Sequence, residues 1–181
     1  VVEREEKCGG QLRAASRPPH KEPLASWVAW ACARLETLGV QVRTGCKHWR
    51  QILEEREWQG VVNACGSQPL IPPIPGSELA INAEARQVLL GDSKVGERVV
   101  IVGAGPVGME TAYFLLERHH RVIVVEEADS PPLSPLTSHG YFLHRLLREG
   151  GELRLGARVC EVTEEGAVIS QKGEREVLQA D

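Results

Sequence analysis

Three glycines spaced as G-x-G-x-x-G lie in the stretch RVVIVGAGPVGME, residues 98–110. Branched apolar residues precede Gly103, and apolar residues at helical spacing follow Gly108. A strand, a glycine turn and a helix in this order form the phosphate-binding start of many dinucleotide-binding units. Similar turns also occur in α/β proteins that bind no nucleotide, so the spacing alone is a weak indication.

The next predicted strand supplies an acid at the place where such a unit needs one. The segment RVIVVE, residues 121–126, ends at Glu126, eighteen residues after Gly108. An acid at this position accepts hydrogen bonds from the 2′ and 3′ hydroxyls of a ribose. We therefore predict dinucleotide binding over the alternative, a tight strand–helix turn followed by a solvated carboxylate.

Two carboxylates decide which dinucleotide is expected. Glu126 and Glu127 would both repel a 2′-phosphate, at a cost of about 1 kcal/mol or more for close like charges. No arginine or lysine follows them before Arg145. The sequence therefore predicts NAD(H) rather than NADP(H).

Each glycine of the turn has its own physical role. Gly103 lets the chain turn sharply out of the strand, Gly105 leaves room for a pyrophosphate beside the backbone, and Gly108 lets the helix pack closely on the strands. The positive end of the helix then faces the phosphate charge. The residues predicted to bind NAD(H) are Gly103, Gly105, Pro106, Val107, Gly108, Glu110, Glu126 and Glu127.

Glu110 lies in the first turn of the predicted helix and has two interpretations. An acid near the positive end of a helix is stabilised by the helix dipole. Alternatively, its carboxylate points toward a bound nicotinamide. The residues alone favour the first interpretation.

Strands and helices are expected to alternate along much of the chain, which indicates an α/β fold with a parallel sheet and helices packed on it. Expected strands lie at 1–3, 40–44, 60–66, 98–102, 121–126, 153–155, 159–162 and 167–170. The strand over 60–66 is expected to be buried. Expected helices lie at 24–38, 47–57, 83–90, 106–119 and 139–151. Residues 4–23 are expected to be a loop, and the proline-rich segment SQPLIPPIPG is expected to be a linker.

Composition and charge exclude several classes of protein. The 181 residues carry a formal net charge of −4, which argues against a nucleic-acid partner. No apolar run reaches the length of a membrane span, and the opening VVEREEKCGG does not resemble a signal peptide. We expect a cytoplasmic protein with no membrane partner, and a homo-oligomeric state is left open.

The cysteines and histidines form no recognisable catalytic or metal-binding pattern. The five cysteines include no C-x-x-C pair, so we expect free thiols that act as small buried hydrophobes, and no redox-active disulfide. The six histidines are scattered or lie at a predicted helix end. The sequence therefore predicts no catalytic side chain and no metal site.

Taken together, the segments resemble a family of flavin oxidoreductases. They are GGQL at 9–12, NACGSQP at 63–69, VGERVVIVGAGPVGMETAYFL at 95–115, RVIVVEEAD at 121–129 and the terminal LQAD. They are similar to the NADH:flavin oxidoreductases, which include 2,4-dienoyl-CoA reductase, enoate reductase and trimethylamine dehydrogenase. The resemblance implies a Rossmann-like fold with two dinucleotide-binding domains, in which an NAD(P)-type domain is nested in an FAD-type domain. It divides the chain into a partial FAD-type domain at 1–76, a linker at 77–94 and an NAD(P)-binding domain at 95–181.

The resemblance also implies residues that bind FAD. Glu3 matches the acid that holds the adenosine ribose of FAD, and Cys65 stands where the family has a threonine. The loop along the flavin nucleotide and the crossover between domains supply Gly10, Gln11, Leu12 and Gly66. A glutamate near the nicotinamide in the family matches Glu110, which moves that residue toward the functional interpretation.

Several parts of the family pattern are expected to lie outside this sequence. They are the first strand and glycine turn of the FAD-type domain, its final strand, an FMN-binding barrel and iron–sulfur cysteines. We therefore expect an excerpt of a longer protein. FAD would be bound in the intact protein, with FMN and an iron–sulfur cluster in regions beyond the excerpt.

The resemblance implies part of an NADH-dependent flavin oxidoreductase. NADH would bind here, and hydride would pass to FAD in the intact protein, for transfer to an enoate-like or other acceptor. Residues 1–181 alone are expected to be inactive. Two alternatives stay open: a non-catalytic module that binds NAD or ADP, and a pyridine nucleotide-disulfide-type reductase or NADH oxidase without a dithiol.

Overall fold

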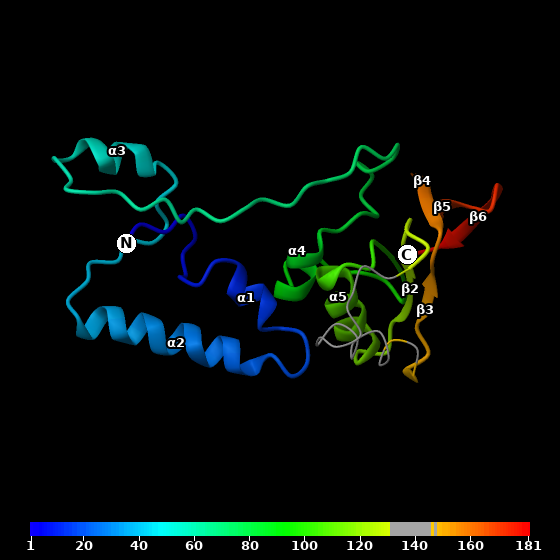
Figure 1. Ribbon diagram of the computed structural model, residues 1–181, viewed down its shortest axis with the longest axis horizontal. Helices are drawn as coiled ribbons and strands as arrows, with labels where there is room; N and C mark the ends of the chain where they lie inside the picture. The colour runs from blue at the N-terminus through cyan, green and yellow to red at the C-terminus, as the bar shows by residue number, and fades with distance from the viewer. Residues whose placement is uncertain (131–145, 147) are drawn as a thin grey trace. The chain divides into compact units, whose positions relative to one another are not determined.

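The computed structural model describes residues 1–130, 146 and 148–181 (Figure 1). Contacts within the chain divide it into unit 1, Val1–Gln68, and unit 2, Pro69–Asp181. The division falls within the proline-rich segment that was expected to be a linker. The assignment of residues 1–76 to a partial FAD-type domain and of residues 95–181 to an NAD(P)-binding domain stays a prediction.

Unit 2 contains a parallel sheet whose strands follow the branched apolar runs of the sequence. Its strands are β1 (Arg98–Val102), β2 (Arg121–Val125) and β3 (Glu152–Arg154), hydrogen-bonded in the order β1-β2-β3. Both pairs are parallel. Because parallel neighbours need a crossover, helix α5 (Pro106–Leu116) connects β1 with β2. This α/β arrangement confirms the predicted fold class.

Helix α5 is buried on nearly all sides. Its side chains from Met109 to Leu115 are all buried, and they include the polar residues Glu110 and Thr111. The helix ends at Leu116, three residues before the predicted end. Beyond it, the Nδ1 of His120 lies 2.7 Å from the Gly96 carbonyl oxygen, with the carbonyl as acceptor. A shorter helix, α4 (Ala85–Leu90), also packs on α5.

An antiparallel sheet follows the parallel one in unit 2. Strands β4 (Ala157–Thr163), β5 (Gly166–Gln171) and β6 (Glu174–Gln179) pair in sequence order. The sequence predicts β4 and β5 but not β6, because β6 buries only Leu178 and lacks an apolar alternation. The predicted helix over 139–151 falls largely outside the described residues.

The two sheets of unit 2 share one hydrophobic core. Val125 at the end of β2 packs with five buried residues of the antiparallel sheet, Ala157, Val159, Ala167, Ile169 and Leu178. Ile74, Val100, Ile123 and Val162 are partly buried against this cluster. The core therefore fixes the carboxyl end of β2, and the predicted ribose acid, Glu126, follows directly after this strand.

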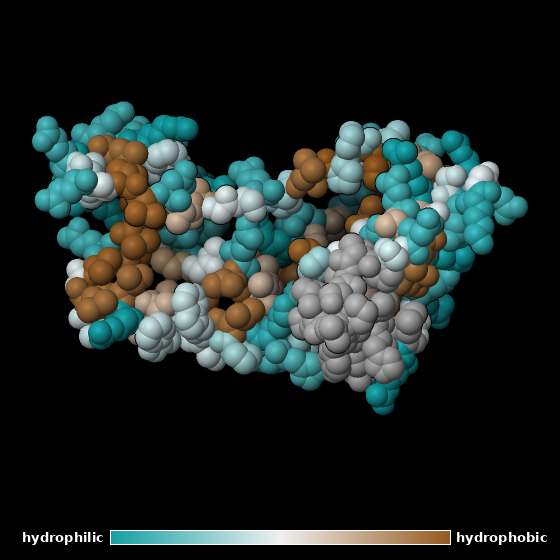
Figure 2. Space-filling model, in the orientation of Figure 1, coloured by the Kyte–Doolittle hydropathy of each residue, from teal (hydrophilic) through white to brown (hydrophobic). Residues whose placement is uncertain are grey.

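Unit 1 is mostly helical and has little buried apolar surface. It contains α1 (Gln11–Ala15), α2 (Glu22–Thr37) and α3 (Trp49–Glu54). The predicted helices over 24–38 and 47–57 are confirmed as α2 and α3, whereas α1 lies in the stretch expected to be a loop. Ala14 and Pro18 are the buried apolar side chains of unit 1, while Trp27 and Trp30 are exposed. Figure 2 shows hydrophobic residues at the surface of the molecule. None of the helices in the described part of the chain is long and apolar enough to cross a membrane.

The predicted buried strand over 60–66 is wrong. Val61 and Val62 retain 61% and 92% of their accessible surface, and no strand is assigned there. A strand needs a hydrogen-bonded neighbour, and within unit 1 the structure has one isolated bridge, between Val2 and Arg43. The predicted strand over 40–44 is reduced to that bridge.

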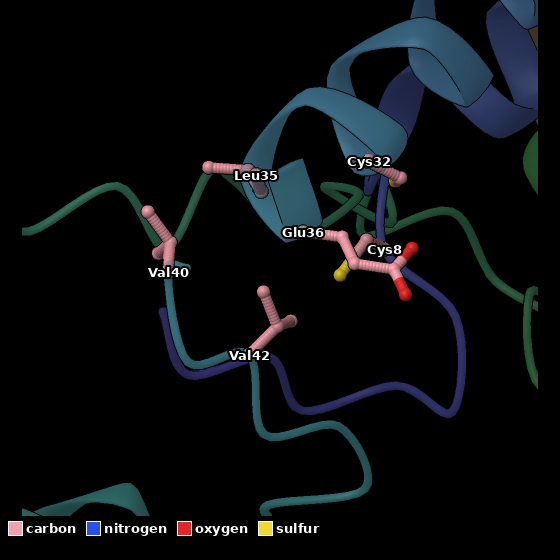
Figure 3. A pocket seen from close by; sticks show the side chains of 6 residues that line it. All are labelled: Cys8, Cys32, Leu35, Glu36, Val40 and Val42. Atoms are coloured by element: carbon pink, nitrogen blue, oxygen red, sulfur yellow. The ribbon is translucent and has the colours of Figure 1, made fainter. Parts of the chain in front are cut away.

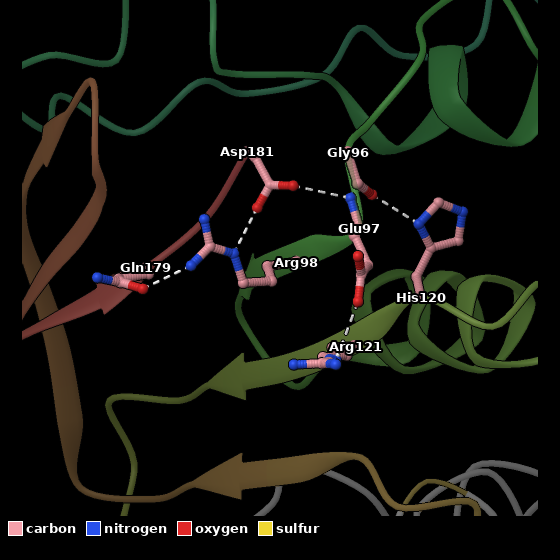
Figure 4. Close-up of polar contacts among 7 residues, drawn as sticks. All are labelled: Gly96, Glu97, Arg98, His120, Arg121, Gln179 and Asp181. Atoms are coloured by element: carbon pink, nitrogen blue, oxygen red, sulfur yellow. Dashed lines mark hydrogen bonds and ion pairs between the residues drawn. The ribbon is translucent and has the colours of Figure 1, made fainter.

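A polar cluster ties the start of β1 to the residues after β6 (Figure 4). Arg98 Nε donates to Asp181 Oδ1 at 2.6 Å, and the Glu97 N–H donates to Asp181 Oδ2 at 3.0 Å. Arg98 also donates to the Gln179 side-chain oxygen. These contacts, with the hydrogen bond from Arg98 as the largest cause, lower the pKa of the Asp181 carboxyl from its ordinary 3.8.

The lowered pKa predicts a pH-dependent contribution of Asp181 to stability. A carboxyl whose pKa is lower in the folded chain stabilises the fold above its unfolded pKa, and this stabilisation disappears as the pH falls through the folded pKa. In urea unfolding, Asp181→Asn should lower the midpoint at neutral pH. The difference from wild type should vanish in acid, where Asp181 is protonated. Asp92→Asn, at an exposed position, is the control. A difference for Asp181→Asn that persists unchanged in acid would contradict the prediction.

Candidate nucleotide-binding site

The glycine turn between β1 and α5 is held by backbone hydrogen bonds and close packing. Gly103 has φ +98°, in the left-handed region that favours glycine, and its N–H donates to the Val125 carbonyl at 2.8 Å. A Cβ on Gly108 would lie 2.0 Å from the Gly103 carbonyl oxygen. The first and third glycines therefore allow the sharp turn and the close approach of α5.

The second glycine leaves open space instead. Gly105 is the N-cap of α5, with φ −68° and ψ 177°, and a Cβ built there would meet no atom within 4 Å. Pro106 follows at the first helical position, where its missing N–H removes no helical hydrogen bond. The first N–H groups of a helix have no acceptor within the helix and carry partial positive charge. The open backbone at Gly105 thus suits an anionic group, and the adjacent Val107 is 61% exposed.

Glu126 lies directly beside this turn, although 22 residues separate it from Ala104. The Ala104 N–H donates to Glu126 Oε2 at 2.8 Å, and the Ala128 N–H donates to Glu126 Oε1 at 2.9 Å. Ala104 is completely buried, whereas Glu126 is partly exposed. Because each carboxylate oxygen can accept more than one hydrogen bond, Glu126 keeps acceptor capacity for hydroxyl groups. The structure therefore brings the predicted acid and the predicted turn together.

Glu127 has a basic neighbour that was not found from the sequence. Arg158 Nε on β4 lies 3.7 Å from Glu127 Oε1, and both side chains are about 70% exposed. The Ala157 N–H donates to the Glu126 carbonyl at 3.0 Å, which places β4 next to the end of β2. A prediction that the start of β4 lies beside the end of β2 would have indicated Arg158 as a neighbour of Glu127. A cation therefore lies near the acid pair, where the sequence alone indicated none before Arg145.

Glu110 is buried within α5, with 8% of its surface exposed, and it has an interaction partner. It does not share the open surface of Gly105 and Val107. Its predicted place near a nicotinamide stays a prediction.

In unit 1, two of the segments expected to contact FAD meet each other. Gln11 Nε2 donates to the Ser67 hydroxyl at 2.7 Å and to the Ser67 carbonyl at 3.3 Å. A Cβ on Gly66 would lie 3.5 Å from the same Gln11 nitrogen. The loop over 9–12 and the crossover segment over 63–69 therefore contact each other, although 56 residues separate Gln11 from Ser67.

The other residues assigned to FAD by resemblance lie near this contact in sequence or begin the chain. Gly10 is exposed with φ +48°, and Leu12 is partly buried in α1. The Glu5 N–H donates to Glu3 Oε1 at 2.9 Å, so the Glu3 carboxylate has a local partner. Their roles toward FAD stay predictions.

The cysteines differ from the sequence-based expectation. None is buried: Cys32 and Cys65 are exposed, and Cys8, Cys46 and Cys160 are partly exposed. The interpretation of all five as buried hydrophobes is wrong, because most of them lie in unit 1, which buries little apolar surface.

The chain is similar in sequence to several known proteins. Residues 35–181 match the family model described as pyridine nucleotide-disulphide oxidoreductase. The chain is 30% identical over 190 residues to an NADH oxidase of Thermoanaerobacter brockii, covering 99% of this chain and 29% of that protein. It is 27% identical over 186 residues to a cinnamate reductase of Clostridium sporogenes, covering 100% of this chain and 28% of that protein.

A solved structure shows the same fold. A 2-naphthoyl-CoA reductase superposes with a TM-score of 0.90 at 20% identity, over 99% of this chain and 28% of that protein. The chain thus spans less than a third of the length of these relatives. The family model matches most of the chain, which shows that the chain belongs to the pyridine nucleotide-disulphide oxidoreductase family.

Proposed function

We propose that this chain is the NAD(H)-binding part of an NADH-dependent flavin oxidoreductase. The observation that carries the proposal is the placement of the Glu126 carboxylate on the Ala104 N–H, 2.8 Å away, within the glycine turn. This carboxylate can accept hydrogen bonds from hydroxyl groups, and it lies next to the open backbone at Gly105. A dinucleotide needs both features, whereas a merely structural turn does not.

The residues of the turn would bind the two chemically different parts of the dinucleotide. The open backbone at Gly105 and the first N–H groups of α5 would receive the pyrophosphate. Glu126 would accept hydrogen bonds from the ribose hydroxyls, and the second carboxylate, Glu127, would disfavour a 2′-phosphate. Arg158 pairs with Glu127 and so offsets part of that repulsion. Because Glu126 accepts hydrogen bonds from backbone N–H groups and keeps its charge, we propose a preference for NADH over NADPH.

The segments of unit 1 support a flavin partner for this site. Gln11 holds the loop over 9–12 against Ser67 of the crossover segment, and both segments match the parts of the family that lie along FAD. A module that only binds NAD or ADP would have no use for this contact. Hydride chemistry would be supplied by the bound nicotinamide and flavin, which the residues named above would hold. The chain itself binds and orients the two cofactors and excludes water.

The acceptor beyond FAD is proposed from the relatives alone. One relative is named as a cinnamate reductase, which favours an enoate-like acceptor for the intact protein. FMN and an iron–sulfur cluster, where they are used, would belong to parts of the intact protein outside residues 1–181.

The test uses the intact protein under anaerobic conditions. It should show a visible flavin absorption band that NADH bleaches, and NADPH at the same concentration should bleach it more slowly. Gln11→Ala should lower the fraction of bound FAD, because the loop over 9–12 loses its hydrogen bonds to Ser67, while the affinity for NADH stays unchanged. Gln51→Ala, on the exposed α3, is the matched control.

Two results would contradict the proposal. A colourless intact protein that still binds NADH would indicate the non-catalytic nucleotide-binding module. A flavoprotein whose flavin is not reduced by either nicotinamide would show that the glycine turn does not deliver hydride.

A further inference from the structure

A cavity of about 320 Å³ in unit 1 is lined by two cysteines from separate segments (Figure 3). Cys8 lies in the chain before α1, and Cys32 lies on α2. The other residues that line the cavity are Leu35, Glu36, Val40 and Val42. Two thiols therefore face one small space, although the sequence contains no motif that pairs them.

The packing of the neighbouring residue shows how closely the chain before α1 approaches α2. A Cβ built on Gly9 would lie 2.8 Å from Val28 Cγ1. Val28 precedes Cys32 by four residues, so the two side chains share one face of the helix. Cys8, next to Gly9, is thereby placed near the Cys32 turn of α2, and the Cys32 thiol is close enough to be one of the causes that raise the pKa of the Cys8 thiol.

The two thiols differ in their surroundings. Burial, followed by the charges of Cys32 and Glu3, raises the pKa of the Cys8 thiol above its ordinary 9.0. Cys32 is exposed and can be reached from solvent. In the described part of the chain, no group of three or more histidine, cysteine or acidic side chains could hold a metal ion. The arrangement therefore favours a sulfur–sulfur bond over metal binding.

We propose that Cys8 and Cys32 form a reversible disulfide that fastens the chain before α1 to α2. The oxidant is a low-molecular-weight disulfide of the glutathione class. The Cys32 thiolate attacks it, forms a mixed disulfide and releases one small thiol. The Cys8 thiolate then attacks the Cys32 sulfur and releases the second small thiol. Two protein thiols are oxidised, one small disulfide is reduced to two thiols, and the two protein protons pass to the released thiols.

The test is oxidation of the fully reduced, folded protein with oxidised glutathione. We expect the protein to lose two of its five titratable thiols and the mass of two hydrogen atoms. Peptide mapping should link Cys8 to Cys32, and dithiothreitol should restore all thiols. The mapping is done on the wild-type chain, so its result does not depend on whether a variant folds.

The controls separate this pair from general thiol reactivity. Cys65→Ser should oxidise like the wild type, because Cys65 is exposed and lies outside the cavity. Cys8→Ser should stop at the mixed disulfide on Cys32. Oxidation in urea should give a much lower yield of the Cys8–Cys32 link, because the fold brings the thiols together. Retention of all thiols by the folded protein, a different linked pair, or an equal yield in urea would each overturn the proposal. None of these readouts depends on the binding of NADH or FAD.

Discussion

Replacing Gly108 by alanine is expected to destabilise unit 2 by about 3 kcal/mol, the upper end of the usual cost of overpacking a core. The new Cβ would lie 2.0 Å from the Gly103 carbonyl oxygen. Backbone on both sides of this contact is fixed, because Gly103 is hydrogen-bonded to Val125 and α5 is buried. Relief of the clash therefore requires α5 to move away from the sheet. Urea denaturation followed by circular dichroism measures the loss.

Gly105→Ala is the matched control for this prediction, because it adds the same methyl group three residues before Gly108 and without the clash. Gly105 has a backbone conformation that alanine adopts, and its Cβ would meet no atom within 4 Å. Its stability should stay within about 0.5 kcal/mol of wild type. NADH affinity should nevertheless fall by about tenfold or more, or about 1.4 kcal/mol, since the methyl group enters the space proposed for the pyrophosphate. Equal stability losses in both variants would contradict the assignment of different roles to the two glycines.

Replacing Glu126 by alanine is expected to weaken NADH binding by about 1–3 kcal/mol, the cost of leaving buried hydroxyl groups without acceptors. NADPH binding should fall less, because loss of the charge also removes a repulsion of the 2′-phosphate. The variant leaves the buried Ala104 N–H without its acceptor as well. Binding is therefore measured by titration calorimetry at a temperature at which denaturation shows the variant to be folded.

Two further variants separate the parts played by Glu126. Glu126→Gln keeps an oxygen for the Ala104 N–H and should retain most of the stability, while it loses the charge that disfavours NADPH. Glu127→Ala should leave NADH binding nearly unchanged and improve NADPH binding, because it releases Arg158 from the ion pair. If Glu126→Ala lowered the affinities for NADH and NADPH equally, Glu126 would not be the ribose acid.

The segment from β1 to β2 could be predicted because the residue types along it and the pairing of its two strands favour the same structure. Branched apolar runs form β1 and β2, the glycines mark the turn, and Pro106 marks the first helical position. The register of β1 and β2 then places Glu126 next to the turn. The turn and its acid were therefore expected together, and the structure brings them within hydrogen-bonding distance.

Other features could not be predicted because they depend on contacts between distant segments. Strand β6 is polar on most of its residues, and its pairing with β5 is what defines it. Arg158 reaches Glu127 only because β4 follows the end of β2 in space. The segment over 60–66 has the composition of a buried strand, yet no neighbouring strand pairs with it in unit 1. An apolar composition favours a strand, but a strand forms only where a neighbouring strand can pair with it.

The hydrogen bonds of the glycine turn also bear on the rate at which a ligand binds. The Gly103 N–H donates to the Val125 carbonyl, and the Ala104 N–H donates to the Glu126 carboxylate. A loop fixed in this way loses little conformational entropy on association, so more of the contact energy appears as affinity. It also presents its binding conformation to every encounter, without a preceding rearrangement that would slow capture. The acid proposed to select the dinucleotide thus also holds in place the backbone that is proposed to receive its phosphates.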